Sequence, residues 1–189
     1  MGERYVVALG SNQRHHRHGA PARVIAAALA ALAQAGVRVV AASPVLASRP
    51  LGPSQRTYSN AAVLVETDCG PADLLVQLQA IEAAFGRRRG GQRWRARVLD
   101  LDIVLWAGGR WTGSGLTVPH REWRTRGFVL TPLCAVAPRW RDPLTGLTPR
   151  HFEARLTRPR ALPKRVTHPR HAVRPLARSE VQLSFKRLV

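Results

Sequence analysis

The sequence predicts an α+β fold in which helices pack on a mostly antiparallel sheet. Short apolar runs typical of strands and longer runs with helical spacing follow one another in the order β-α-β-β-α-β, with turn residues between them. This order is typical of a ferredoxin-like α/β sandwich. The chain has 189 residues, of which 45% are hydrophobic, so it is long and apolar enough to bury one ordinary core.

The first half of the chain contains the first helix and three of the expected strands. Pro21 can begin a helix and Gly36 can end it. The turn residues after Leu9 end the first strand, and three prolines and one glycine make residues 43–57 a loop. The expected elements are a strand at 5–9, a helix at 21–35, a strand at 37–42, a loop at 43–57 and a strand at 58–66.

The second half contains the clearest helical pattern. Leu74, Leu78, Ile81 and Phe85 recur at helical spacing and predict a helix. The segment that follows holds six arginines and three glycines, and we expect it to be a mobile loop. The expected elements are a helix at 68–85, a loop at 86–97, a strand at 98–106 and a short helix at 126–136.

The chain is strongly basic, with 30 basic and 11 acidic residues and a net charge of +19. Such a charge attracts polyanions, but nearly all the basic residues are arginine, as in GC-rich genomes, so charge alone does not settle the partner. From residue 157 the chain becomes rich in proline and arginine. We therefore expect a domain at 1–156 and a basic tail at 157–189 that is disordered or loosely docked.

The cysteines and the apolar runs predict a cytoplasmic protein. Cys69 and Cys134 have neither metal-ligand nor redox spacing, which is typical of reduced thiols. The first residues lack the apolar run of a signal peptide, and the longest apolar stretch is too short for a bilayer, which needs about 20 residues. We expect no contact with a membrane.

Asp100 and Asp102 form the sharpest local motif. On a strand, alternate side chains share a face, so Leu101, Ile103 and Leu105 would face the core and the two carboxylates would point together to the other side. Mg²⁺ commonly takes one or two carboxylates plus substrate phosphates. The alternative is that the two carboxylates only pair with neighbouring arginines.

The arginine-rich segment just before this motif favours phosphate chemistry. Arginine offers planar, bidentate donors to phosphate oxygens, and arginines beside a metal-binding pair are the parts of a phosphoryl-transfer site. The same segment could instead be a solvated basic run or an RNA-binding patch. A Walker-type nucleotide site is excluded, because its glycine-lysine motif is absent.

Three other positions could contribute to a ligand site. Glu82 borders the buried face of its helix, or it is a surface residue that pairs with Arg87 or Arg88. Tyr58 and Asn60 share one strand face, and an aromatic ring beside an amide suits a flat heterocycle, although either could simply pack in the core. The histidines at 15, 16 and 18 indicate a flexible polar loop rather than a metal site.

Together these motifs resemble the 6-hydroxymethyl-7,8-dihydropterin pyrophosphokinase family of folate biosynthesis. The order and spacing of the motifs hold from about Tyr5 to about Phe152. The matching pieces are Gly10-Ser11-Asn12, Pro50-Leu51-Gly52-Pro53, Gln55, Tyr58 to Val63, Ile81-Glu82, Gly86 to Arg89, Arg93-Trp94, Arg97 to Ile103, Val118-Pro119-His120 and Arg126 to Leu130.

The resemblance implies a Mg²⁺-dependent diphosphokinase that transfers pyrophosphate from ATP to the hydroxymethyl oxygen of the pterin and releases AMP. Asp100 and Asp102 would hold two Mg²⁺ ions. Side chains implied at the nucleotide, its phosphates and the closing lid are Glu82, Arg87, Arg89, Trp94, Arg97, His120 and Arg126. Side chains implied at the pterin are Ser48, Leu51, Tyr58, Asn60 and Phe128. We expect a monomer with no specific nucleic-acid partner.

Two departures from the family pattern keep other functions open. Arg95-Ala96 stands after the lid tryptophan, where Gly-Pro is usual, and Ser48-Arg49 replaces the usual pair near the pterin. One alternative is therefore a catalytically weak paralogue with an altered substrate. The other is a basic nucleic-acid-binding protein that uses the net charge.

Overall fold

The computed structural model describes residues 2–48, 57–86, 97–113 and 115–159 of the chain. The segment Met1–Arg158 forms one compact unit and Pro159–Val189 is assigned to a second. In the described part of the chain, every helix is too short or too polar to cross a membrane.

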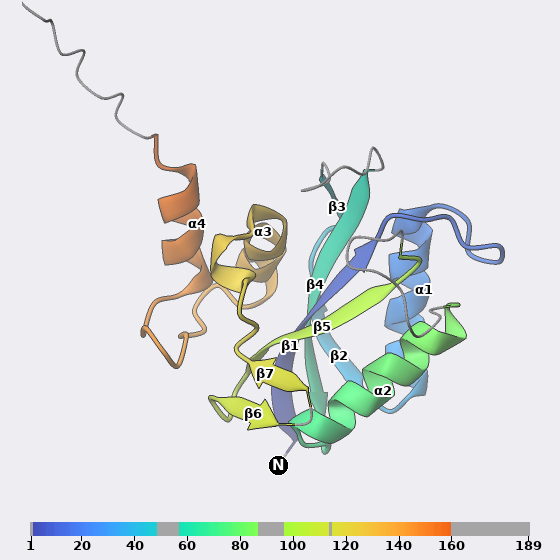
Figure 1. Ribbon diagram of the computed structural model, residues 1–189, viewed down its shortest axis with the longest axis horizontal. Coiled ribbons are helices and arrows are strands. Elements are labelled where there is room, and N and C mark those ends of the chain that lie inside the picture. Colours follow the sequence, from blue (N-terminus) through green and yellow to red (C-terminus); the bar gives the residue numbers. More distant parts are fainter. Residues whose placement is uncertain (1, 49–56, 87–96, 114, 160–189) are drawn as a thin grey trace, which may run out of the picture. The chain divides into compact units, whose positions relative to one another are not determined.

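A five-stranded sheet forms the centre of the first unit, and all its pairings are antiparallel (Figure 1). The strand order is β2-β4-β1-β5, and the short β3 pairs with β4. This order is that of a ferredoxin-like sandwich and confirms the predicted fold. The strands are β1 (Glu3–Ser11), β2 (Arg38–Ala42), β3 (Leu46–Ser48), β4 (Tyr58–Thr67) and β5 (Asp100–Trp106).

Helices cover both faces of this sheet (Figure 1). On one face lie α1 (Pro21–Gln34) and α2 (Pro71–Ala84), each with a proline in its first turn. Gly36 and Gly86 follow these helices with φ of 78° and 88°, a left-handed conformation that stops a helix at little cost. On the other face lie α3 (Gly127–Val136) and α4 (Pro149–Thr157).

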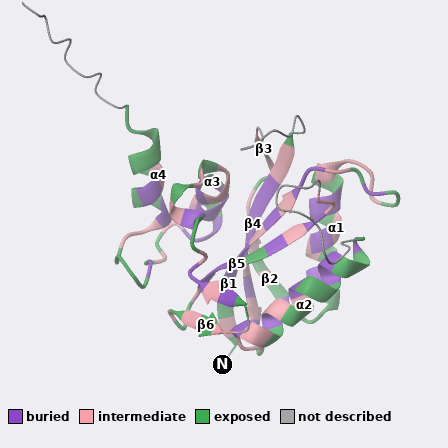
Figure 2. Ribbon diagram, in the orientation of Figure 1, coloured by how far each residue is buried: buried purple, intermediate pink, exposed green. Residues whose placement is uncertain are grey.

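The alternation of side chains along β1 divides the core into two clusters. Tyr5, Val7 and Leu9 pack with α1 and α2, whereas Val6 packs with Trp123 and the apolar residues of α3. Because both faces are covered, the central strands are buried on both sides (Figure 2). The sequences of such strands are nearly continuous apolar runs, because neither face is exposed to water.

The predicted alternation along β5 is wrong at its end. Leu101 and Ile103 pack in the α1–α2 cluster as expected, but Leu105 packs in the α3 cluster. The cause is a bulge: Val7 pairs with Ile103 and Val6 with Leu105, so Val104 is the extra residue. Beyond this residue each side chain of β5 points to the face opposite the one predicted.

Two predicted boundaries are also corrected. The loop expected at 43–57 contains β3, whose residues Leu46–Ser48 pair with Tyr58–Asn60, because no proline or glycine interrupts them. The strand expected from Val98 begins only at Asp100. Its approach is diverted because the backbone of Arg97 hydrogen-bonds to Asn12 instead of to a strand.

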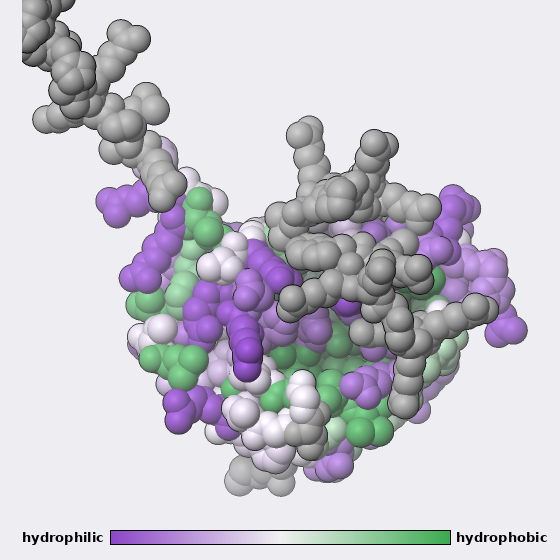
Figure 3. Space-filling model, viewed as in Figure 1, coloured by the Kyte–Doolittle hydropathy of each residue, from purple (hydrophilic) through white to green (hydrophobic). Residues whose placement is uncertain are grey.

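Several short elements were missed by sequence reasoning. They are the hairpin of β6 (Trp111–Gly113) and β7 (Leu116–Val118), the 3₁₀ helix η1 (Trp123–Thr125), and α4. Helix α4 begins with a capping box in which Thr148 and His151 satisfy each other's backbone N–H groups. Hydrophilic and apolar residues lie side by side on its exposed part (Figure 3), and it buries mainly Pro149 and Phe152.

Removing the C-terminal segment after Arg158 should leave the first unit folded, because the described core lies within that unit. We expect a shift of the thermal midpoint smaller than about 2 °C. Binding to a nonspecific polyanion should become weaker and less dependent on salt, because fewer counterions are released. Differential scanning calorimetry and a salt titration check both expectations; a truncated chain that fails to fold would contradict the first.

Candidate functional site

The two aspartates lie beside Gly10 on the central strand. Gly10 pairs with Asn60 of β4 on one side and with Asp100 of β5 on the other, and Ala8 pairs with Asp102. Since Leu101 and Ile103 face the α1–α2 cluster, Asp100 and Asp102 share the face on the α3 side, as the alternation predicted.

Arg97 holds Asp100 from the turn before β5. One guanidinium nitrogen lies 2.6 Å from each carboxylate oxygen of Asp100. Burial lowers the pKa of Arg97, but the neighbouring charges of Asp100, Asp102 and Glu82 outweigh this and raise it. The structure thus shows the arginine contact of the alternative interpretation for Asp100, while metal binding stays a prediction.

Asn12 fixes the backbone of Arg97, and sequence reasoning gave it no role. Its side-chain oxygen accepts the Arg97 N–H at 2.7 Å, and its own N–H donates to the Arg97 carbonyl at 3.1 Å. The Gly-Ser-Asn motif after the first strand was the available signal, because asparagine commonly satisfies backbone groups at turns. Arg97, three residues before Asp100, is therefore held by the residue that follows β1.

Glu82 is buried, so its alternative placement on the surface is wrong. Only 2% of the residue is exposed, and its Oε1 accepts the backbone N–H of Leu101 at 2.8 Å. Leu101 lies between the two aspartates. Helix α2 is therefore hydrogen-bonded to β5 at the residue between the two aspartates.

The residues expected at the pterin lie on β3 and β4. Asn60 is buried, and its Nδ2 donates to Ser48 Oγ at 2.8 Å. This contact orients the amide, whose oxygen lies near Gly10. Tyr58, the first residue of β4, pairs with Ser48 and is half-buried.

Another three expected site residues lie on one short segment after β7. His120 donates its backbone N–H to the carbonyl of Val104 on β5, at 3.0 Å. Arg126 and Phe128 follow at the start of α3, with the guanidinium carbon of Arg126 6.0 Å from the centre of the Phe128 ring. Helix α3 contacts β3 and β4. The segment therefore connects β5, which carries the aspartates, with the strands that carry Ser48, Tyr58 and Asn60.

One histidine of the loop at 13–19 packs against the fold, while His16 and Arg17 are exposed. His15 is buried and lies against His18 and Phe85, the residue that ends α2. Its Nδ1 accepts two backbone N–H groups. Burial, followed by the nearby charges of His16, His18 and Arg17, lowers the pKa of His15, which favours the neutral ring.

Four predicted site residues lie outside the described part of the chain: Leu51, Arg87, Arg89 and Trp94. Within the described residues, no group of three or more His, Cys, Asp or Glu side chains could hold a metal ion. Any metal at Asp100 and Asp102 would therefore take further oxygen ligands from water or from a substrate.

Comparison with known families shows to which family this chain belongs. The family described as 7,8-dihydro-6-hydroxymethylpterin-pyrophosphokinase (HPPK) matches residues 6–138. The chain belongs to this family. The resemblance predicted from the motifs is thereby confirmed, and so is the predicted class of enzyme, a pyrophosphokinase of folate biosynthesis, at the level of the family.

Curated relatives agree with this assignment. The 2-amino-4-hydroxy-6-hydroxymethyldihydropteridine pyrophosphokinase of Pseudomonas aeruginosa is 43% identical over 76% of this chain and 86% of its own. The enzyme of the same name from Synechocystis is 40% identical over 60% of this chain, and the match spans 58% of that relative's length. These relatives and this chain share most of the first unit.

Solved structures show the same fold. The crystal structure of Plasmodium falciparum HPPK-DHPS with pteroate has a TM-score of 0.63 over 82% of this chain and 42% of that one. At 12% identity this similarity concerns the fold alone. It confirms the predicted α+β architecture.

Replacing Glu82 by alanine should destabilise the fold more than replacing it by glutamine. Alanine leaves the buried N–H of Leu101 without its acceptor, which costs about 1–3 kcal/mol, whereas glutamine keeps an oxygen that can accept. Urea unfolding of the two variants and the wild type measures the difference. Equal losses in both variants would show that this hydrogen bond does not support β5.

Proposed function

We propose that the protein transfers the diphosphoryl group of ATP to the hydroxymethyl oxygen of 6-hydroxymethyl-7,8-dihydropterin and releases AMP. The observation that carries this proposal is the pair Asp100 and Asp102 on one face of β5, opposite Asn60 across Gly10. Anionic ligands for a metal and a polar edge for a heterocycle thus border the same short stretch of sheet.

The carboxylate pair fits Mg²⁺ by its chemistry. Both side chains are hard oxygen donors on one strand face, and the described residues supply no third carboxylate or histidine to complete a site. Asp100 and Asp102 would hold two such ions beside the bound triphosphate. Such ions neutralise the charge on the transferring group.

The chain's own cations would bind the nucleotide. Arg97 is already held by Asn12 and Asp100, so its guanidinium is oriented before a phosphate arrives. His120 and Arg126, on the segment before α3, would contact the nucleotide as well. The arginines at 87 and 89, Trp94 and the buried Glu82 complete the proposed set around ATP.

Residues at the start of β4 and the start of α3 would bind the pterin. Tyr58 and Phe128 offer aromatic faces for stacking, and the amide of Asn60 can read a polar edge. Since Ser48 fixes the orientation of this amide, it contributes to the choice of substrate. Leu51 belongs to the same proposed set.

These residues act by positioning more than by acid–base chemistry. The pterin hydroxyl oxygen attacks the β-phosphorus, the bond from this phosphorus to the oxygen shared with the α-phosphorus breaks, and AMP leaves while the hydroxyl proton is released. The reaction needs alignment of the two substrates and neutralisation of charge. A monomeric state, a cytoplasmic location and the lack of a specific nucleic-acid partner stay predictions.

Incubation with ATP, Mg²⁺ and the hydroxymethylpterin should give AMP in step with pterin diphosphate, and none when the pterin or Mg²⁺ is left out. Chromatography of the nucleotides is the measurement. ADP as the only pterin-dependent nucleotide product would refute the transfer of a diphosphoryl group. Binding of ATP without turnover would favour the weak paralogue instead.

Replacing Asp102 by asparagine separates metal binding from a structural ion pair. The change keeps the shape and removes one of two neighbouring negative charges, so stability without metal should stay level or rise slightly. Turnover should fall by a factor on the order of 100 or more, because charge neutralisation is lost. Thermal melting beside the turnover number checks this; a destabilised variant that kept its turnover would refute metal binding.

A further inference from the structure

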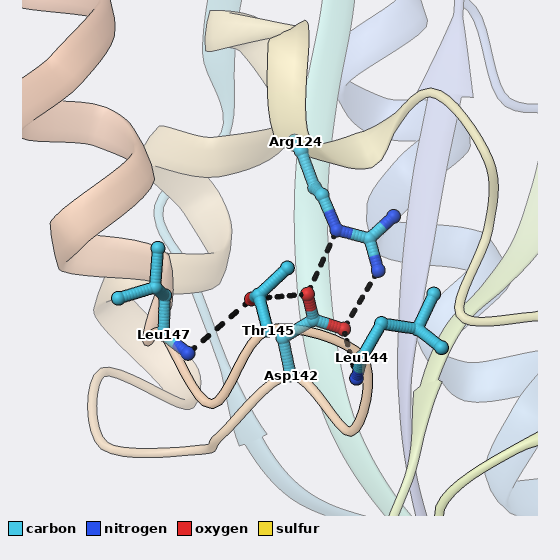
Figure 4. A network of polar contacts seen from close by, with 5 residues as sticks. All are labelled: Arg124, Asp142, Leu144, Thr145 and Leu147. Atoms are coloured by element: carbon cyan, nitrogen blue, oxygen red, sulfur yellow. Dashed lines mark hydrogen bonds and ion pairs between the residues drawn. The ribbon is translucent and has the colours of Figure 1, made fainter.

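A buried ion pair lies just outside the candidate site. Asp142, in the loop between α3 and α4, is fully buried and accepts two bonds from Arg124 of η1, at 2.8 Å from Nε and 2.7 Å from the terminal nitrogen (Figure 4). The match to the family ends at residue 138, so Arg124 lies inside it and Asp142 beyond it.

The Asp142 carboxylate is also hydrogen-bonded within its own loop. It also accepts the hydroxyl of Thr145 at 2.6 Å and the N–H of Leu144 at 3.3 Å (Figure 4). Burial raises the pKa of Asp142, but these bonds and that from Arg124 outweigh it and lower the pKa. The loop therefore presents a fixed negative charge to η1.

The segment that receives this charge carries three proposed site residues. Arg124 stands four residues after His120, two before Arg126 and four before Phe128. Trp123, its neighbour, is fully buried and packs edge-on against Phe152 of α4, with ring centres 5.0 Å apart. The C-terminal part of the unit thus contacts η1 through two adjacent side chains.

Among the described residues, the start of α3 has no side-chain cap, and Arg126 makes only a long ion pair of 3.9 Å, with Glu122. Arg126 occupies the capping position with extended backbone. A buried ion pair adds little net stability compared with apolar residues of the same volume, so orientation is the contribution for which this pair is suited. A bidentate arginine contact fixes both the distance and the angle of its backbone.

We propose that Asp142 is a positioning residue for the reaction: through Arg124 it sets where Arg126 and Phe128 stand over the sheet. This inference rests on the proposed function of those two residues. The loop at 142–147 and α4 then serve the active site without touching a substrate. A displacement of about 1 Å in a positioned group can cost about 100-fold in rate.

The test compares Asp142→Asn with a matched control, Glu66→Gln. Glu66 also binds two arginines, Arg4 and Arg38, but it lies at the other end of β4. Kinetics are measured at a temperature where every variant is fully folded by circular dichroism. We expect kcat/KM for the pterin to fall about tenfold or more in Asp142→Asn, with a raised KM, and to stay within about twofold in the control.

A double-mutant cycle with Phe128→Ala shows whether Asp142 acts through the start of α3. In the Phe128→Ala background, Asp142→Asn should cost much less than in the wild type, because coupled residues are not additive. If Asp142→Asn fails to fold, Arg124→Lys replaces it. That change keeps the charge but loses the bidentate contact, and it should lower kcat/KM in the same direction.

The outcomes separate the two proposals. An active wild type whose Asp142→Asn variant melts earlier but keeps its kcat/KM would show a structural pair only and would overturn this inference. Full additivity with Phe128→Ala would overturn it as well. A wild type that forms no AMP from ATP and the pterin would refute the proposed function, and this inference with it.

Discussion

The pairing of β1 with both β4 and β5 is the constraint on which the candidate site depends. Because β1 lies between them, residues from two strands that are 40 positions apart in the chain, Asn60 and Asp100, come to either side of Gly10. The apolar alternation of β1 fixes this register, since a slip by one residue would turn Tyr5, Val7 and Leu9 away from α1 and α2. Core packing and site geometry are therefore set together.

Two polar contacts then fix the start of β5 more finely than packing alone. Asn12 binds the backbone of Arg97, and Glu82 binds the backbone of Leu101. The residues between and beside these anchors carry the two carboxylates. Both anchors are buried, and an oxygen of each accepts a backbone N–H, so they favour one arrangement of the strand over near alternatives.

Local patterns predicted the elements and the shared face of Asp100 and Asp102, because these depend on periodicity along a single strand or helix. The bulge at Val104 could not be predicted, since it arises from how β1 and β5 pair. Glu82 was recognised as a candidate residue, but its acceptor role depends on a strand 19 positions away. The ion pair of Arg124 and Asp142 likewise joins segments that only the folded chain brings together.

Metal binding by the carboxylate pair is the central claim, and counting bound ions tests it most directly. Mn²⁺ can replace Mg²⁺ and be titrated by electron paramagnetic resonance in the presence of a non-hydrolysable ATP analogue and the pterin. We expect about two ions per wild-type chain. In the double variant Asp100→Asn with Asp102→Asn, binding should fall to that of the free analogue. An unchanged number of bound ions in that variant would contradict the account.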